Sequence, residues 1–337
     1  SGGVDSSVAA ALLKEQGYDV AGATLKLWGG ESDSGCCSIS DVEDARRVAA
    51  QLDIPHYVFN LTDTFDEVVV NPYVDAYVQG RTPNPCIECN RQVKFGAFLA
   101  HADALGIDLV ATGHHARIED RDGHPALLRG HDPAKDQAYV LSVMSPAAIA
   151  RTLLPVGNLT KAEVRAHADR LGLRTAQKAE SMDVCFITKG GRTAFIEARA
   201  EAQPGTVVST TGEVIGEHDG VHAFTVGQRR GTGIALGERA YVVDVDAPSA
   251  TVTLGTKADL MRDAVALEQV VFTHAPLGAD EAITVQVRAH GESIPAHLDG
   301  DTVRFDVLGR KIEARVSSVR RVDWKDSRNG GFMFVFR

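Results

Sequence analysis

The chain has 337 residues, of which 44% are hydrophobic and 24% charged, a composition typical of a globular protein with two or three domains. No apolar run approaches the roughly 20 residues of a membrane helix and no signal-peptide pattern opens the sequence, so we expect a cytoplasmic protein without membrane contact. The net charge of −10 argues against indiscriminate nucleic-acid binding, although residues 301–337 hold nine Lys and Arg against five Asp and Glu, a local net charge of +4.

Helical and strand patterns alternate through the first half of the chain. Strands separated by helices predict βαβ units, and therefore an α/β fold with a parallel sheet covered on both faces. The expected elements are helices at Asp5–Gln16, Thr62–Val78 and Arg91–Leu105, strands at Tyr18–Trp28, His56–Asn60 and Asp108–Thr112, and a proline-rich loop at Arg81–Asn90.

The pattern changes after residue 196. Short alternating runs bounded by Gly and Asp predict all-β structure. We expect a catalytic domain over residues 1–196, a small central domain over 197–258 and a β-barrel-like domain over 259–337. The runs are Gly205–Val208, Ala240–Val245, Ala250–Leu254, Ile283–Val287, Thr302–Val307 and Ile312–Val316.

The chain opens on Ser1-Gly2-Gly3-Val4-Asp5-Ser6-Ser7, directly before the first helix. Two glycines let the backbone approach an anion closely, and the helix N-terminus supplies unpaired N–H groups, so we predict a phosphate-binding loop rather than a plain glycine-rich cap. No Gly-Lys-Ser/Thr follows, which excludes a Walker-type loop. Because such a loop normally follows a strand, we expect a few residues, forming a central strand, to precede Ser1.

Two cysteines, Cys86 and Cys89, lie in the proline-rich loop. Cys89 stands at the expected start of a helix, where the helix dipole favours a thiolate. Structural zinc usually needs four N or S ligands and the chain has no second CxxC, so reactive thiols are favoured over half a zinc knuckle, with idle thiols the plain alternative.

A third thiol, Cys185, stands in an expected apolar strand, Ser181–Ile187. A lone cysteine in such a strand is usually a packing residue. A phosphate loop, a loop thiol and a distant third thiol together indicate sulfur chemistry instead, in which one cysteine carries a persulfide and another resolves it.

Several segments occur in the same order as in bacterial tRNA-uridine 2-sulfurtransferases of the PP-loop ATP pyrophosphatase superfamily, and residues 1 to about 299 resemble that family. These segments are SGGVDSS at the start, Leu25–Trp28, the GRTPNPCxxCN string at residues 80–90, Ala111–Arg117, Lys135–Gln137, Asp183–Phe186 and Phe224–Arg229.

The resemblance implies a parallel-sheet PP-loop domain (adenine nucleotide alpha hydrolase-like), a small central domain and a C-terminal β-barrel. It implies that ATP, with Mg²⁺, adenylates the 2-oxygen of a wobble uridine in tRNA. Sulfur from a cysteine persulfide then replaces that oxygen, giving 2-thiouridine, AMP and pyrophosphate. The implied sulfur donor is a persulfide carrier or a cysteine desulfurase.

The resemblance also implies a role for each residue that matches the family's motifs. Cys185 bears the persulfide and Cys89 is the nucleophile or resolving thiol, so that the two form a disulfide. The ATP site comprises Ser1, Gly2, Gly3, Val4, Asp5, Ser6, Leu25 and Gly113, and the tRNA site comprises Asn84, Pro85, Cys86, His114, Lys135, Asp136, Gln137 and Arg288.

Two features depart from the family. Many relatives carry a carboxylate at the position of Cys86, so this chain has three thiols, Cys86, Cys89 and Cys185, which form the ligand set for a 4Fe–4S cluster in an alternative version of the reaction. Residues 300–337 lack the family's Pro-Gly-Gln segment and glycine-rich end. We therefore expect this tail to pair poorly with the barrel.

Two other interpretations stay open at this point. One is a PP-loop ligase or amidotransferase for a small metabolite, although such an enzyme needs neither the thiol pair nor the β-rich half. The other is a non-catalytic nucleotide- or tRNA-binding remnant, suggested by the atypical ends.

Overall fold

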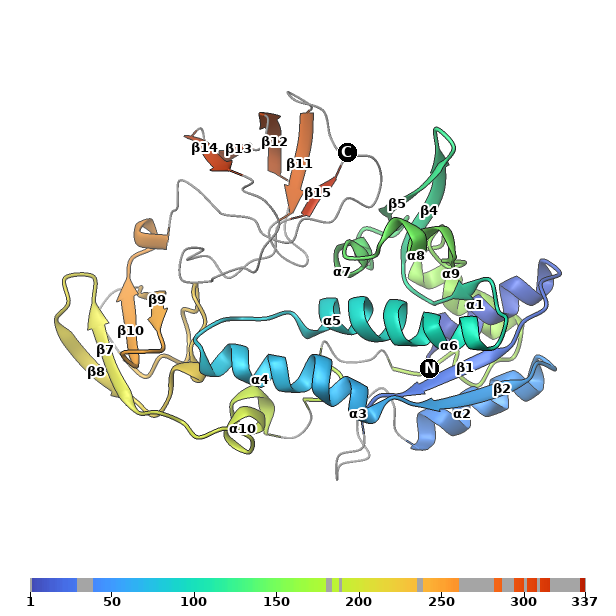
Figure 1. Cartoon of the computed structure of the whole chain (residues 1–337), viewed down its shortest axis with the longest axis horizontal. Coiled ribbons are helices and arrows are strands. Elements are labelled where there is room, and N and C mark those ends of the chain that lie inside the picture. Colours follow the sequence, from blue (N-terminus) through green and yellow to red (C-terminus); the bar gives the residue numbers. More distant parts are fainter. Residues whose placement is uncertain are drawn as a thin grey trace. The chain divides into compact units, whose positions relative to one another are not determined.

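The computed structural model describes most of the first 260 residues and five strands beyond them. The described ranges are 2–28, 39–179, 184–187, 190–234 and 239–260, with strands at 282–286, 294–299, 302–307, 310–315 and 334–336. They divide into two compact units. The first unit holds residues 2–70 and 85–187, and the second holds 71–84 and the described residues from 190 onward (Figure 1).

The first unit alternates helices with parallel strands, as predicted. β1 pairs in parallel with β2 (Figure 1), and β3 pairs in parallel with β6. Its helical segments are α1 (Val4–Glu15), α2 (Ile39–Gln51), α3 (Thr62–Phe65), η1 (Asp66–Val70), α5 (Pro85–Glu88), η2 (Cys89–Ala97), α6 (Phe98–Ala104), α7 (Ala138–Leu141), α8 (Pro146–Ala150) and α9 (Lys161–Arg170). Its strands are β1 (Gly22–Lys26), β2 (His56–Asn60), β3 (Val110–Ala111), β4 (Ala116–Arg121), β5 (His124–Arg129) and β6 (Thr152–Leu153).

A hairpin that was not predicted, β4 with β5, follows the third strand. The two strands pair antiparallel around Asp122-Gly123, and both turn residues have positive φ, +54° and +80°. Asp-Gly is a favoured pair for such a two-residue turn, so the signal was present in the sequence. The Oδ1 atom of Asp120 accepts from the N–H of Gly123 (3.0 Å), which closes the turn.

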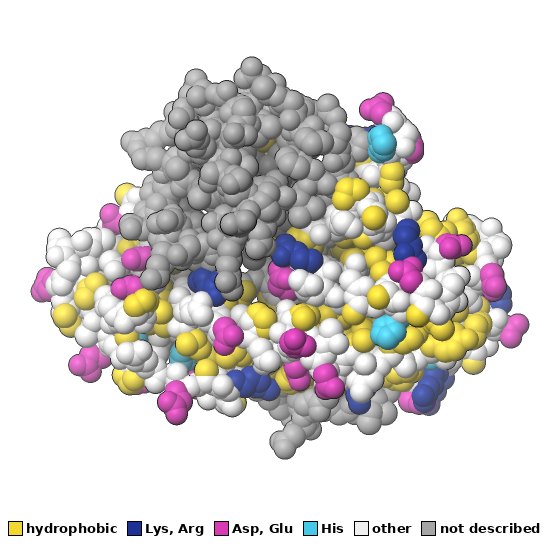
Figure 2. Space-filling model, in the orientation of Figure 1, with side chains coloured by type: hydrophobic (Ala, Val, Ile, Leu, Met, Phe, Trp, Pro, Cys, Tyr) yellow, Lys and Arg dark blue, Asp and Glu magenta, His cyan; other side chains and the backbone are white. Residues whose placement is uncertain are grey.

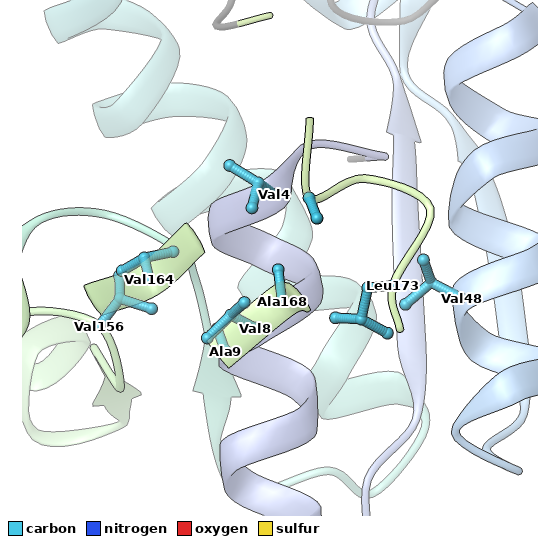
Figure 3. Packing of buried hydrophobic residues seen from close by; sticks show 9 residues of the cluster. Val4, Val8, Ala9, Val48, Val156, Val164, Ala168 and Leu173 are labelled. Carbon is cyan, nitrogen blue, oxygen red and sulfur yellow. The ribbon is translucent and has the colours of Figure 1, made fainter. Parts of the chain in front are cut away.

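One hydrophobic cluster of the first unit lies between α1 and α9. Val8, Val164 and Ala168 are fully buried, and Figure 3 shows Val8 of α1 beside the two residues of α9. Removing each such side chain from water stabilises the fold by about 1–3 kcal/mol. Thr160 starts α9 with a capping box: its hydroxyl accepts from the N–H of Glu163, whose carboxylate accepts from the N–H of Thr160. This packing fixes the start of α9 against the start of α1.

The second unit is mainly β-structure. Its core packs Val207, Val242, Val252 and Leu254 of one sheet against Phe224. That sheet has the order β8-β7-β10-β9, and a five-stranded sheet has the order β14-β13-β12-β11-β15. The strands are β7 (Gly205–Ser209), β8 (Val214–His218), β9 (Tyr241–Asp246), β10 (Thr251–Gly255), β11 (Ala282–Gln286), β12 (Ile294–Asp299), β13 (Thr302–Val307), β14 (Arg310–Arg315) and β15 (Phe334–Phe336). The helical segments are α4 (Asn71–Val78), α10 (Gly191–Glu197), η3 (Val221–Ala223) and η4 (Ala258–Leu260).

One arginine ties α4 into the second unit. The guanidinium of Arg192 donates to the carbonyl of Ala223 (3.2 Å) and to the hydroxyl of Thr225 (3.3 Å), and it lies 4.8 Å from the ring centroid of Tyr77. The helix expected over Thr62–Val78 is confirmed, since all of these residues are helical. The chain forms α3, a π-helical segment and α4, and α4 belongs with the β-rich unit.

The strands of the tail do pair. β13 and β14, which match two of the expected alternating runs, form a hairpin, and β15 runs antiparallel to β11 from Thr284–Phe336 to Gln286–Phe334. The expectation of poor pairing is wrong for these strands, because their alternating sequences suit a sheet whatever their relation to the family. Trp324 lies outside the described residues, and no helix within the described ranges is long and apolar enough to cross a membrane.

Candidate nucleotide and thiol site

The phosphate loop enters α1 through two glycines. Gly2 is buried with φ +66°, and a Cβ there would stand 2.2 Å from the carbonyl oxygen of Asp41 on α2, so no other residue fits. Gly3 caps α1 with extended backbone, and its carbonyl accepts from the hydroxyls of Ser6 (3.1 Å) and Ser7 (2.8 Å). The loop thus presents the N-terminal N–H groups of α1, while Ser1 lies outside the described residues.

Gly113 lies against this loop. A Cβ on Gly113 would stand 2.5 Å from the backbone nitrogen of Ser6 and 2.6 Å from the carbonyl carbon of Asp5. The fold therefore brings together two segments that sequence reasoning assigned to one ATP site. Leu25 is half-buried on β1, opposite Phe59 of β2.

Asp5 is the centre of a charged cluster. Both of its carboxylate oxygens accept from Nζ of Lys161 (2.7 and 2.8 Å), and Oδ1 also accepts from Nε2 of His115 (3.1 Å). Burial alone would raise the pKa of Asp5, but the hydrogen bonds from His115 and Lys161 outweigh it and lower that pKa. Asp5 is therefore ionised at neutral pH. The buried Nδ1 of His115 has no hydrogen-bond partner among the described residues.

A second lysine fixes the other side of the loop. Nζ of Lys178 donates to Oδ1 of Asp41 (2.7 Å) and to Oδ2 of Asp44 (2.6 Å), both on α2. Burial would lower the pKa of Lys178, but the two carboxylates raise it. These two hydrogen bonds from Lys178 fix the first turn of α2, and the backbone carbonyl of Asp41 in that turn lies against Gly2.

His114, assigned to the tRNA site by resemblance, is part of a hydrogen-bonded chain. Its Nε2 lies 3.3 Å from Nζ of Lys94, and its Nδ1 lies 2.8 Å from Oγ1 of Thr112. An ammonium can only donate, so Nε2 accepts and Nδ1–H donates to Thr112. Burial, and then the ammonium of Lys94, hold the pKa of His114 well below its usual range. The ring is neutral at pH 7.

The segment Lys135–Gln137 has divided roles. Oδ1 of Asp136 accepts from the N–H groups of Gly130 (2.9 Å) and Ala138 (3.0 Å), and Oε1 of Gln137 accepts from the N–H of His115 (2.9 Å). Two of the three side chains assigned to tRNA thus have structural contacts. Asp136 closes the loop between Gly130 and Ala138, and Gln137 holds this loop against the turn of His114 and His115. Lys135 is half-buried in the same loop.

Cys86 and Cys89 lie on helical structure rather than in a loop. The helix begins at Pro85, whose fixed φ suits the first turn of a helix, and the prediction of a loop up to Asn90 is therefore wrong. The two cysteines are three residues apart and lie on the same face, Cys86 half-buried and Cys89 8% exposed. Asn90 is buried beside them, and its Nδ2 donates to the carbonyl of Val140 (2.9 Å). Asn84 directly precedes this helix.

Cys185 lies in a turn, so the prediction of an apolar strand is wrong. Its neighbour Phe186 is 2% exposed, with ring centroids 5.6 Å from Phe65 and 6.1 Å from Trp28. Among the described residues, contacts between aromatic rings, and not hydrogen bonds to a neighbouring strand, therefore hold this turn in place. Cys185 itself is half-buried.

The three thiols are not gathered into a metal site. Among the described residues, which include Cys86, Cys89 and Cys185, no three His, Cys, Asp or Glu side chains are grouped so as to hold a metal ion. The side chains as placed therefore do not fit an iron–sulfur cluster. Arg288, assigned to tRNA, lies outside the described residues, as do Cys36 and Cys37.

Sequence reasoning missed two residues of the site. His115 lies within the segment Ala111–Arg117 that carries the resemblance, but neither it nor Lys161 is given a role by the sequence. Lys161 follows Thr160 of a capping box, a signal that places it in the first turn of a helix. Nothing local indicates that its partner is Asp5, which lies 156 residues earlier in the sequence.

Parallel strands, a glycine-rich loop and the helix that follows it define the first unit as an α/β domain of the PP-loop class. Residues 1–189 match a family described as the tRNA methyl transferase HUP domain, and residues 193–256 match the tRNA methyl transferase PRC-barrel domain.

Curated relatives are similar over most of the chain. Three named tRNA-specific 2-thiouridylase MnmA come from Moorella thermoacetica (50% identical over 78% of this chain and 76% of the relative), Geotalea uraniireducens (45% over 88% and 82%) and Mycolicibacterium gilvum (46% over 91% and 88%). The chain belongs to the tRNA-specific 2-thiouridylase family.

Proposed function

We propose that this protein is a tRNA-uridine 2-sulfurtransferase, which uses ATP to convert the wobble uridine of tRNA into 2-thiouridine. The observation that carries the proposal is a single α/β unit holding both a phosphate loop and three cysteines. The family supplies the substrate, since the relatives are named for tRNA and for 2-thiouridine formation.

The first half-reaction activates a poor leaving group. The 2-oxygen of uridine attacks the α-phosphorus of ATP, an O–P bond forms, and the bond to pyrophosphate breaks. The N-terminal N–H groups of α1 stabilise the charge on the phosphates, and Gly2, Gly3, Val4, Ser6 and Gly113 shape the loop that receives them. Leu25 completes the nucleotide site.

The second half-reaction transfers sulfur. The terminal sulfur of a persulfide on Cys185 attacks C2, and AMP leaves with the former 2-oxygen. The Cys89 thiolate then attacks Sγ of Cys185, which releases 2-thiouridine and leaves a disulfide between Cys89 and Cys185. A thiol reductant restores both thiols, and a persulfide-bearing donor protein reloads Cys185.

The tRNA approaches the thiols from the side of His114 and Lys135, with Arg288 as a further contact. Asn84, Pro85 and Cys86 contact the target base, which is unstacked from its loop to reach them. Asp136 and Gln137 act indirectly, because their side chains hold the loop and the turn of His115. The substrate places the reaction in the cytoplasm.

Mg²⁺ accompanies ATP in this proposal. Both oxygens of Asp5 already accept from Lys161, so this carboxylate does not offer a free ligand, and no step is assigned to a protein-held metal. Mg²⁺ commonly binds through substrate phosphates and water with few protein ligands.

A division of the chain into three domains is consistent with the proposed thiolation of tRNA. We propose that residues 1–196 form the catalytic domain, 197–258 the small central domain and 259–337 a β-barrel-like domain. The matched PRC-barrel region and the separate five-stranded sheet support the second boundary.

Methyl transfer is the second candidate, because the matched family descriptions name it. Methylation has no need of a phosphate loop or of paired thiols, whereas thiolation uses both. An ATP–pyrophosphate exchange assay tests the choice. Exchange that requires tRNA supports thiolation, and a methylated tRNA formed without AMP would support methyl transfer. Exchange driven by a small metabolite would support a ligase, and none at all a non-catalytic remnant.

The iron–sulfur alternative has its own test. Anaerobic reconstitution with iron and sulfide should leave the protein colourless and fully active under the persulfide proposal. Brown protein whose colour and activity are both lost in Cys86→Ser would instead support the cluster.

A further inference from the structure

Two ion pairs join α1 and α9, one at each end. Lys161 pairs with Asp5 at the N-terminal ends of the two helices, and Arg170 pairs with Glu15 at their C-terminal ends. The helices therefore run in the same direction, with Val8 and Val164 between them (Figure 3). The two pairs differ in burial. The Lys161 side chain is 13% exposed, whereas Arg170 and Glu15 are 52% and 44% exposed.

The less exposed pair, Lys161 with Asp5, lies at a position where an uncompensated negative charge would weaken the binding of ATP. Asp5 is in the first turn of α1, beside the N–H groups that would receive the phosphates. An ionised carboxylate there satisfies the helix dipole, but it repels a polyphosphate at the same position. The lowered pKa of Asp5 keeps this charge in place at neutral pH.

Lys161 is held in position independently of the phosphate loop. Its backbone N–H donates to Oδ2 of Asp132 (3.0 Å), and Thr160 caps the helix that it begins. Asp132 belongs to the loop that also holds His115, the second donor to Asp5. The ammonium is thus preorganised on a rigid element.

We infer that Lys161 is a positioning residue of the nucleotide site: by bonding both oxygens of Asp5 it cancels the charge of this carboxylate and fixes its direction, so that the loop accepts the triphosphate of ATP. The inference rests on the proposed function, since it assumes that this loop binds ATP.

A double-mutant cycle with two ligands tests it. Binding of ATP and of adenosine is measured by calorimetry for the wild type, Lys161→Met, Asp5→Asn and the double variant, with Arg170→Met as the matched control for the exposed pair. We expect Lys161→Met to weaken ATP binding by roughly tenfold or more and adenosine binding by less than about twofold. In the Asp5→Asn background, the same change should alter ATP binding by less than about threefold, because no charge remains to be cancelled.

Each outcome has one meaning. Unchanged ATP affinity in Lys161→Met would overturn the inference, and equal losses for ATP and adenosine would show that Lys161 only stabilises the fold. An undiminished loss in the Asp5→Asn background would show direct contact with phosphate instead of charge cancellation. Should Lys161→Met fail to fold, Lys161→Gln, made in both the wild-type and the Asp5→Asn backgrounds, carries the same comparison. A wild-type protein that does not bind ATP would instead overturn the proposed function.

Discussion

Replacing Gly113 by Ala should damage the nucleotide site without unfolding the first unit. The new Cβ would stand 2.5 Å from the Ser6 nitrogen and 2.6 Å from the Asp5 carbonyl carbon. Ordinary contacts between heavy atoms are about 3.5–4.0 Å long, so the turn and the phosphate loop must separate by roughly 1 Å. Gly113 is not among the glycines with positive φ, so this clash acts alone.

The expected effect on the reaction follows from that displacement. A misplacement of about 1 Å can reduce a rate by on the order of a hundredfold, because the reacting atoms no longer meet in line. We therefore expect Gly113→Ala to reduce tRNA-dependent ATP–pyrophosphate exchange by roughly that factor. Gly17→Ala is the control, since its Cβ meets nothing within 4 Å and it adds only the strain of φ +88° at the far end of α1.

Two results would refute this reasoning. Unchanged exchange in Gly113→Ala would mean that the phosphates bind elsewhere. Equal losses in Gly113→Ala and Gly17→Ala, in proportion to their melting temperatures, would mean that stability alone decides activity.

Three further predictions concern the thiols and their surroundings. Cys185→Ser and Cys89→Ser should each abolish 2-thiouridine formation and leave ATP binding intact in calorimetry; thiolation retained in either variant would remove that residue from the mechanism. Phe186→Ala should destabilise the first unit by about 3–5 kcal/mol in urea unfolding, and Phe186→Leu by clearly less; equal, small effects would mean that the aromatic contacts do not hold this turn. The depressed pKa of His114 means that the unfolded chain takes up a proton that the folded chain excludes, so stability should fall as pH drops below about 6.5. His114→Gln should lessen this fall between pH 7 and pH 5, and an identical pH dependence of melting in both proteins would contradict the assignment.

Local sequence patterns predicted where helices and strands occur better than they predicted the bounds and the type of each element. The α/β alternation, the helix after the phosphate loop and the hairpin of β13 and β14 follow from periodicity and turn residues, which are local. The proline-rich pattern of residues 81–90 predicts a loop, although Pro suits the first turn of a helix and a helix begins at Pro85. Cys185 was placed in a strand because a short apolar run does not distinguish a strand from a buried turn.

Some residues of the candidate site could likewise be predicted from the sequence, whereas the contacts between others could not. The residues of the phosphate loop and the three thiols carry recognisable motifs, so they could be named from the sequence. The pairing of Asp5 with Lys161 and His115 depends on helix packing over long sequence separations, and no local pattern encodes it. Asp136 shows the converse, since its motif suggested tRNA contact while its carboxylate satisfies backbone N–H groups.

Three exposed hydrophobic side chains lie close together in the sequence after α6. Leu105, Ile107 and Leu109 follow α6 with exposures of 54%, 37% and 42%, and Figure 2 shows hydrophobic side chains gathered over this end of the first unit.

Mass spectrometry of nucleosides shows directly whether this protein thiolates tRNA. Unmodified tRNA is incubated with the protein, ATP and a sulfide or persulfide source, then digested to nucleosides. We expect a uridine in which one oxygen is replaced by sulfur, formed with ATP and absent from reactions with Cys185→Ser. Unmodified uridine throughout, or a nucleoside heavier by a methyl group, would contradict it.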